Sequence, residues 1–119
     1  MKNKIISLII CFLLLTACDK NSYKTITSNE AINIIENKKA VIIDVRTKEE
    51  YSLGYIKNAI NNPIDSFNVN YDKDTIIIVY CASGVRSANV ANLLINKGYT
   101  NVYNLDGGLT NWKYKLVTE

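Results

Sequence analysis

A cysteine stands between an apolar segment and an amphipathic one, in the run Cys81-Ala-Ser-Gly-Val-Arg86-Ser87. Cysteine acts as a nucleophile in the thiolate form, and a helix N-terminus or a nearby arginine lowers the thiol pKa. Gly84 suits a loop that curls its N–H groups inward, because glycine tolerates backbone conformations that other residues resist. Arg86 carries a planar set of donors that fits an oxyanion. The run therefore predicts a nucleophilic cysteine in an anion-binding loop.

The alternative interpretation of this run is structural. A single cysteine after a buried strand is more often a small core residue, and Gly with Arg before a helix is more often a turn and a solvated surface. The catalytic interpretation gains its weight from the coincidence of a strand end, Cys81, Gly84, Arg86 and a helix start within seven residues.

The composition narrows the available chemistry. None of the 119 residues is histidine, which excludes a Ser-His-Asp triad, a Cys-His dyad and a histidine-ligated metal site. The three cysteines include no C-x-x-C pair, so neither a thiolate zinc cluster nor thioredoxin-like redox chemistry is expected. We expect no metal and no cofactor.

Short apolar runs alternate with helical patterns along the chain. Strands are predicted at 40–45, 59–61, 75–80 and 101–105, with 75–80 at the sheet centre, and helices after Thr27, from Thr47 to near Gly54, and over 86–97. This alternation predicts one α/β domain, with a central, mainly parallel sheet of about five strands flanked by helices on both faces. Ligands bind at the carboxyl ends of such strands, where the Cys81 loop would lie.

The first residues have the pattern of an export signal. Lys2 and Lys4 precede an apolar stretch that ends in Leu15-Thr-Ala-Cys18, and this junction resembles the bacterial lipobox. A membrane-spanning helix fits less well, because residues 5–17 number 13 and a span needs about 20. We predict a lipoprotein signal peptide at 1–17, a lipidated Cys18 with a tether at 18–24, and a domain at 25–117; an ordinary cleaved signal is the alternative.

A lipidated Cys18 has consequences for the location and redox state of the protein. Acyl chains such as palmitate would hold it at the cell membrane, facing the periplasm or extracytoplasmic space. Without Lys2 and Lys4 the 14 cations fall to 12 against 11 carboxylates, and this balance gives no indication of nucleic-acid binding. Cys81 would be the one free thiol of the mature chain, in a compartment that favours oxidation.

Three separated motifs carry a resemblance to a known family. The loop Tyr80–Ser87 looks like the active-site loop of single-domain rhodaneses, which are sulfurtransferases. Further matches to that family's pattern lie upstream and downstream, in the expected order: Asp44-Val-Arg46, Glu50-Tyr51, Gly54-Tyr55-Ile56, Ala59, Asn62, Pro63, Gly107-Gly108 and Trp112. The resemblance covers about residues 24–115, and it departs from the family at Tyr55, where a histidine is usual.

The resemblance implies a rhodanese-like fold and a persulfide mechanism. Cys81 would take sulfane sulfur from a small anionic donor such as thiosulfate and pass it to a thiol or a protein acceptor, with the chain acting as a monomer. Arg86 would orient the donor. The loop residues would hold the persulfide through their N–H groups, with help from the hydroxyls of two serines: Ala82, Ser83, Gly84, Val85, Arg86 and Ser87.

Asp44, Arg46 and Glu50 admit two interpretations. Asp44 follows a strand neighbouring the one that ends at Cys81, so it could act at the site. Alternatively, the three side chains form a structural network of charges and helix caps near the site, and the frequency of such pairs favours this interpretation.

Two rival functions remain at this stage. Cysteine-dependent phosphatases and some arsenate reductases use a similar loop with one residue more between Cys and Arg; the four residues between Cys81 and Arg86 make a smaller cradle, suited to a sulfur atom. The other rival is a membrane-tethered module that carries sulfur or docks a partner. Retention of Cys81, Gly84 and Arg86 favours catalysis over docking.

Overall fold

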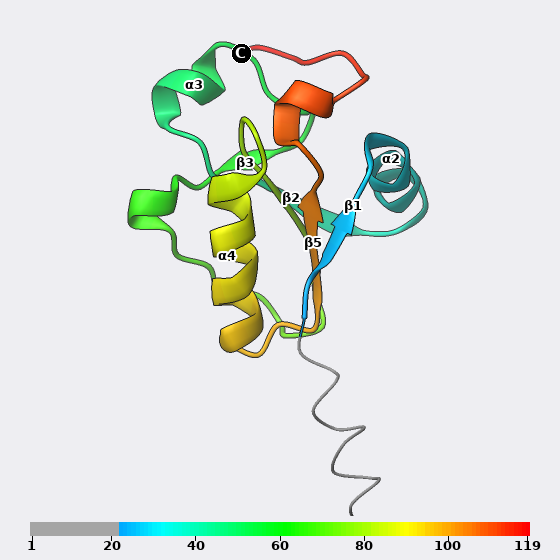
Figure 1. Cartoon of the computed structure of the whole chain (residues 1–119), viewed down its shortest axis with the longest axis vertical. Coiled ribbons are helices and arrows are strands. Elements are labelled where there is room, and N and C mark those ends of the chain that lie inside the picture. Colours follow the sequence, from blue (N-terminus) through cyan, green and yellow to red (C-terminus); the bar gives the residue numbers. More distant parts are fainter. Residues whose placement is uncertain (1–21) are drawn as a thin grey trace, which may run out of the picture.

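The computed structural model describes residues 22–119 and contains a single five-stranded sheet (Figure 1). Its order is β1-β5-β4-β2-β3 and every pair is parallel, which confirms the predicted α/β class and places β4 at the centre. The strands are β1 (Lys24–Ile26), β2 (Ala40–Asp44), β3 (Ile60–Asn61), β4 (Ile76–Tyr80) and β5 (Asn101–Leu105). The predicted signal peptide and Cys18 lie outside the described residues.

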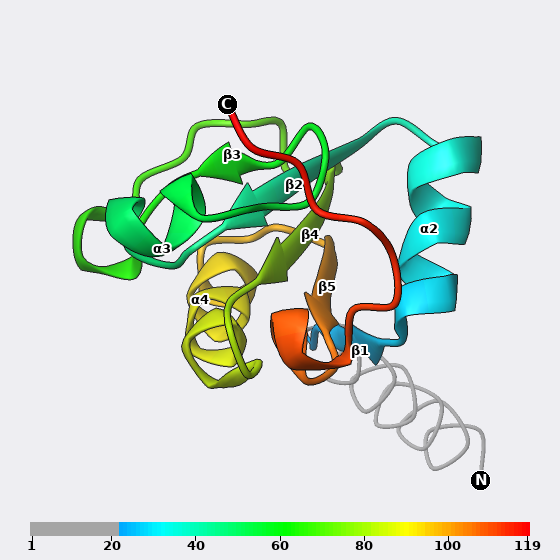
Figure 2. The same cartoon turned by 90° about the horizontal axis from the view of Figure 1, so that it is seen from above.

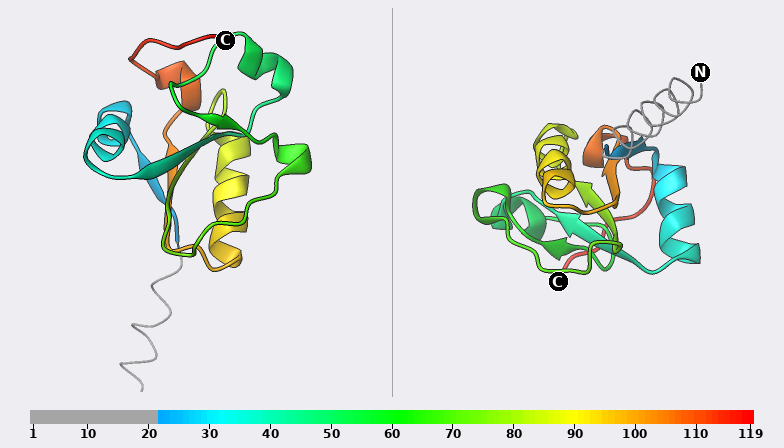
Figure 3. Two further views of the ribbon diagram at one scale, coloured as in Figure 1. Left: turned by 180° about the vertical axis from the view of Figure 1, so that it is seen from behind. Right: turned by 90° about the horizontal axis from the view of Figure 1, so that it is seen from below.

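Helices cover both faces of the sheet, as predicted. Figures 2 and 3 show α2 on one face and α4 on the other. The α-helices are α2 (Ser28–Asn37), α3 (Lys48–Ser52) and α4 (Val85–Asn96), and two 3-10 turns follow other strands, η1 (Ile64–Ser66) and η2 (Gly108–Asn111). None of the helices in the described part of the chain combines the length and apolar character that a bilayer span requires.

Helix boundaries follow the capping signals in the sequence. Thr27 and Thr47 each form a capping box, with Glu30 and Glu50 as the returning side chains. Helix α4 starts at Val85, one residue earlier than predicted, and ends before Gly98. Gly98 has a φ of +98°, and its N–H donates to the Ile95 carbonyl, which satisfies the helix end as expected.

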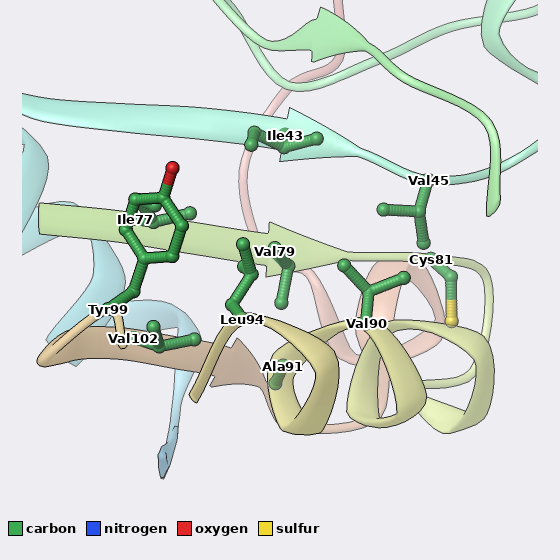
Figure 4. Packing of buried hydrophobic residues seen from close by; sticks show 10 residues of the cluster. All are labelled: Ile43, Val45, Ile77, Val79, Cys81, Val90, Ala91, Leu94, Tyr99 and Val102. Atoms are coloured by element: carbon green, nitrogen blue, oxygen red, sulfur yellow. The ribbon is translucent and has the colours of Figure 1, made fainter. Parts of the chain in front are cut away.

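The alternating side chains of β4 divide the core into two halves. Ile77 and Val79 face α4, together with Cys81, which continues the same alternation one step beyond the strand (Figure 4). Ile78 and Tyr80 face α2 on the opposite side. All five side chains are buried. The period of two that builds a doubly covered sheet therefore also directs Cys81 to the α4 side.

Strand β1 is absent from the sequence-based prediction, which treats residues up to Lys24 as a tether. Of its three residues only Ile26 is buried, whereas Lys24 and Thr25 are exposed. The strand forms because it pairs with β5 in parallel register, Ile26 opposite Leu105. An edge strand with one buried side chain carries no apolar pattern that periodicity can detect.

Candidate active site

Cys81 lies at the carboxyl end of the central strand, directly before the loop that enters α4. The residue is fully buried, and its sulfur points into the curl formed by the loop and the first turn of α4 (Figure 4). This is the position at which open parallel sheets bind ligands.

The Cys81 sulfur accepts three hydrogen bonds from the loop and the helix. The Gly84 N–H lies 3.1 Å from Sγ, the Ser87 N–H 3.5 Å and the Ser87 Oγ 3.4 Å. A cysteine that serves only as a small apolar core residue needs no such donors. The set of donors is what an anionic sulfur requires.

These donors also shift the ionisation of the thiol. Burial of the sulfur disfavours the charged form, but the hydrogen bonds from Ser87 and the Gly84 N–H favour it, with help from the nearby Ser83 N–H. The net effect lowers the pKa of the Cys81 thiol below its ordinary value. Thiolate is therefore present at a lower pH than in an exposed, unpartnered cysteine.

The two carbonyls at the start of the Cys81 loop are bonded from outside the loop. Turn η2 lies against the back of the loop, where the Leu109 N–H donates to the Cys81 carbonyl (3.0 Å) and the Thr110 N–H to the Ala82 carbonyl (3.1 Å). The Thr110 Oγ adds a bond of 3.0 Å to the same Ala82 carbonyl. Because the C=O and N–H of one peptide unit point in opposite directions, these bonds direct the N–H groups of Ala82 and Ser83 to the inner side of the loop.

Two glycines make this arrangement sterically possible. Gly84 has a φ of +94°, the left-handed conformation that lets the chain turn from the loop into α4. Gly108 has a φ of +55°, and a Cβ there would overlap the Cys81 carbonyl oxygen and lie 2.9 Å from the Ala82 carbonyl carbon. Gly108, the second glycine of the Gly107-Gly108 pair, therefore allows the close approach of η2 to the loop.

Arg86 is bound by Glu50 of α3. The Arg86 Nη1 donates to Glu50 Oε1 at 2.7 Å and Nη2 to Oε2 at 2.9 Å, so both arms of the guanidinium are occupied. Each side chain is about a third exposed. Hydrogen bonds from Arg86, and further ones from Thr47, lower the pKa of Glu50 to about 2. Glu50 is thus ionised at every physiological pH.

Asp44 and Arg46 form a separate buried ion pair beside the site. The Arg46 Nη2 lies 2.7 Å from Asp44 Oδ2 and 2.6 Å from the Gly54 carbonyl oxygen. The Asp44 side chain is completely buried and that of Arg46 is 8% exposed. Among the hydrogen bonds of residues 22–119, none joins this pair to the Cys81 loop. Its geometry is that of a structural link between β2 and the segment after α3.

Removal of the Asp44 charge is expected to destabilise the fold. Asp44→Asn leaves the Arg46 guanidinium buried without its counter-charge, and loss of one partner of such a pair costs about 3 kcal/mol or more in free energy of unfolding. Urea unfolding followed by circular dichroism measures this loss. Asp65→Asn, a substitution at an exposed carboxylate, is the matched control and should change stability by less than about 0.5 kcal/mol. Equal stabilities of the two variants would contradict the structural role.

The structure places the remaining predicted loop residues in different roles. The N–H of Ser83 faces the sulfur, whereas its exposed hydroxyl takes part in none of the hydrogen bonds found over residues 22–119. The hydroxyl of Ser87, by contrast, reaches the sulfur. Val85 is 67% exposed at the first position of α4, and Ala82 contributes the carbonyl that η2 holds. The described residues show no grouping of three acidic, cysteine or histidine side chains as metal ligands.

Sequence reasoning missed two positioning residues, Asn104 and Thr110. Asn104 is buried on β5, and its Nδ2 donates to the Gly84 carbonyl at 3.2 Å. The one available signal for Asn104 was a polar residue between Tyr103 and Leu105 in a predicted strand. Thr110 follows the Gly107-Gly108 pair, but nothing in its spacing indicates that it would reach the Ala82 carbonyl.

Tyr55, which stands where the family usually has histidine, and Tyr80, which precedes Cys81, both have structural contacts. Tyr55 stacks on Tyr51 with ring centroids 4.0 Å apart, and its backbone pairs with Val117. The Tyr80 ring points to the α2 side, away from Cys81, and its hydroxyl accepts the Ile56 N–H at 3.1 Å. Trp112 packs against the half of the core that faces α2 and contains Tyr80.

The hydroxyl of Ser87 should contribute measurably to thiolate formation. In Ser87→Ala the Sγ loses one donor, so the pKa of Cys81 rises and alkylation by iodoacetamide at pH 7 slows by about fivefold. The pH profile of the alkylation rate should move to higher pH. Ser83→Ala keeps its N–H and is expected to move the profile less. A profile unchanged by Ser87→Ala would show that the backbone donors alone set the thiol pKa.

Comparison with known proteins gives consistent results at the level of family. A family model described as a rhodanese-like domain matches residues 27–115. A thiosulfate sulfurtransferase, GlpE, from Coxiella burnetii is 34% identical over 94 residues, which cover 76% of this chain and 88% of the relative.

Solved structures share the same architecture. A rhodanese-like domain protein from Staphylococcus aureus has 40% identity and a TM-score of 0.73, over 81% of this chain and 98% of that one. A rhodanese-related protein from Thermoplasma volcanium has 30% identity and a TM-score of 0.71, over 82% and 100% of the two chains.

Proposed function

The chain belongs to the rhodanese-like domain family, and from this premise we propose that it is a sulfurtransferase that works through a persulfide on Cys81. The observation that carries the proposal is the set of three hydrogen bonds converging on the Cys81 sulfur. The similarity to a thiosulfate sulfurtransferase supports thiosulfate as a donor.

In the first half-reaction the Cys81 thiolate attacks the outer sulfur of thiosulfate. The new bond joins the two sulfur atoms, the sulfur–sulfur bond of thiosulfate breaks, and its electron pair leaves with sulfite. The cysteine becomes the persulfide anion Cys81–S–S⁻, so charge and atoms balance without any redox partner. Lowering of the thiol pKa by the loop donors supplies the attacking thiolate.

In the second half-reaction a nucleophilic acceptor takes the outer sulfur. Attack by cyanide or by a thiolate breaks the persulfide bond, and the electron pair returns to the Cys81 sulfur as thiolate. Turn η2 holds the start of the loop from behind, and we expect the loop N–H groups to stabilise the anion in both states without rearrangement of the backbone.

The cellular setting is proposed from the N-terminal sequence alone. A lipid on Cys18 would hold the domain at the outer side of the cytoplasmic membrane or in the periplasm, as a monomer on a short tether. There Cys81 would meet donors and acceptors of the envelope and would need an external reductant or a bound sulfur to escape irreversible oxidation.

A substrate comparison separates the candidate functions. The purified chain is incubated with thiosulfate and cyanide, and in parallel with an aryl phosphate and with arsenate plus a thiol. Production of sulfite and thiocyanate with negligible phosphate release supports the sulfurtransferase. Turnover of the phosphate ester or arsenate at a comparable rate would support the phosphatase or reductase class. Uptake of one sulfur per chain with very slow release to small acceptors would favour the carrier module.

A further inference from the structure

The cation of the Cys81 loop is neutralised within the protein. Both arms of the Arg86 guanidinium are bound by the Glu50 carboxylate, at 2.7 and 2.9 Å. A donor with two negative charges would find at this position a carboxylate as well as an arginine. The N–H groups of Arg86 that Glu50 binds would become available to such a donor only if it displaced that carboxylate.

Glu50 is also firmly held in this position. Its Oε1 accepts bonds from the Thr47 N–H (3.1 Å) and the Thr47 hydroxyl (3.2 Å) in the capping box of α3. Displacement of the carboxylate from Arg86 would therefore disturb a helix cap as well as an ion pair. The capping box thus holds the Glu50 carboxylate in the position in which it binds Arg86.

Two exposed apolar side chains stand close in the sequence to the residues of the ion pair. Val85 precedes Arg86 and is 67% exposed, and Leu53 follows Glu50 by three residues and is 84% exposed. Leu53 directly follows the last residue of α3, and its N–H donates to the Glu50 carbonyl. An organic substituent on a donor would find apolar contacts here, whereas a second charged oxygen would not.

On these grounds, and resting on the proposed sulfurtransferase function, we propose that Glu50 is a specificity-determining residue that disfavours dianionic donors. The donor class favoured by this site is a singly charged organic sulfane-sulfur compound, of which a thiosulfonate is the simplest example. With it, the Cys81 thiolate takes the outer sulfur as Cys81–S–S⁻, the sulfur–sulfur bond breaks, and the electron pair leaves with the organic sulfinate.

The test compares two donors of matched shape and different charge. Thiosulfate carries two negative charges, and methanethiosulfonate carries one because a methyl group replaces one oxygen. The rate constant for sulfur loading of Cys81 is measured for each donor by mass spectrometry of the full chain, with the modified residue located by peptide mapping. The informative quantity is the ratio of the two rate constants, since an effect on the thiol itself cancels.

Glu50→Gln is the diagnostic variant, because glutamine keeps the capping box and one acceptor for Arg86 while it removes the charge. We expect the ratio of thiosulfate to methanethiosulfonate loading to rise by about fivefold, and this gain to shrink as salt is added. Glu49→Gln is the matched control: Glu49 is the exposed neighbour on α3, and its ratio should stay at the wild-type value. An unchanged ratio in Glu50→Gln, or an equal rise in Glu49→Gln, would overturn the proposal.

A second readout keeps this inference separate from the proposed function. Alkylation of Cys81 by anionic iodoacetate and by neutral iodoacetamide needs no sulfur transfer, and the ratio of their rates should rise in Glu50→Gln and stay constant in Glu49→Gln. If neither donor transfers sulfur to Cys81 in wild type or in either variant, both the sulfurtransferase function and the donor preference are refuted. If sulfur is transferred to Cys81 but Glu50→Gln changes neither the ratio of sulfur loading nor the ratio of alkylation rates, only the proposed role of Glu50 is refuted.

Discussion

Replacement of Cys81 by serine should lower sulfur transfer from thiosulfate to cyanide by at least about a thousandfold, because removal of a catalytic nucleophile leaves only binding and orientation. The hydroxyl introduced by Cys81→Ser would be far less acidic than the thiol and could not form a persulfide. The side chains are similar in size, so the buried site next to Val79 and Val90 should keep its packing. Thiocyanate formation in the steady state measures the effect.

The matched control for this prediction uses the other two cysteines. A chain with Cys11 and Cys18 both replaced by serine keeps Cys81 as its one thiol and should retain wild-type turnover in solution. Circular dichroism of Cys81→Ser establishes that the fold persists. Substantial turnover by a folded Cys81→Ser protein would remove the basis of the covalent mechanism.

Gly108→Ala should lower sulfur transfer by about a hundredfold, since displacement of catalytic groups by about 1 Å has effects of this size. The added Cβ would overlap the Cys81 carbonyl oxygen and approach the carbonyl carbon of Ala82, and these are backbone atoms that cannot rotate away. Either η2 or the loop must move. The N–H groups of the loop are then displaced from the Cys81 sulfur. The thiol pKa should rise, so slower alkylation at neutral pH is the accompanying readout.

Gly98→Ala separates this effect from backbone strain. Gly98 also has a positive φ, +98°, but a Cβ there meets only the Lys73 side chain at 3.9 Å, at the end of α4 far from Cys81. Each substitution should cost about 1–2 kcal/mol of stability from the left-handed conformation. Only Gly108→Ala should also lose activity and thiol reactivity at temperatures where both proteins are folded. Equal activity losses in the two variants would show that η2 does not position the loop.

The main elements of the fold could be predicted because they carry strong local signals. The apolar run before Cys81 is long and β-branched, as expected for a central strand covered on both faces, and the capping boxes at Thr27 and Thr47 mark two helix starts. Strand β1 escaped prediction because its one buried side chain, Ile26, depends on pairing with β5 rather than on local pattern.

The candidate site shows a similar division between local and long-range information. Cys81, Gly84 and Ser87 lie within one short segment, and their convergence follows from a strand that ends where a helix begins. The support behind the loop comes from residues about 20 or more positions away, such as Asn104 and Thr110. Their hydrogen bonds depend on where β5 and η2 are placed by the sheet, and no spacing in the sequence encodes this.

Arg86 has a partner in the structure that the sequence did not assign to it. The resemblance to rhodaneses implied that its guanidinium would orient the donor, whereas the structure shows that Glu50 occupies both arms. The network of charges predicted near the site consisted of Asp44, Arg46 and Glu50 and did not include Arg86. The consequence of the pair between Arg86 and Glu50 for donor charge became visible once the bidentate geometry was known, because a single shared bond would leave the second arm of Arg86 available.

Intact-mass spectrometry of the full chain after exposure to thiosulfate tests the central claim most directly. The persulfide mechanism predicts a gain of one sulfur, about 32 Da, located at Cys81 by peptide mapping, absent from Cys81→Ser and removed by cyanide with release of thiocyanate. A chain that turns over thiosulfate without this adduct, or that carries the added sulfur in Cys81→Ser as well, would contradict the claim that Cys81 is the sulfur-carrying nucleophile.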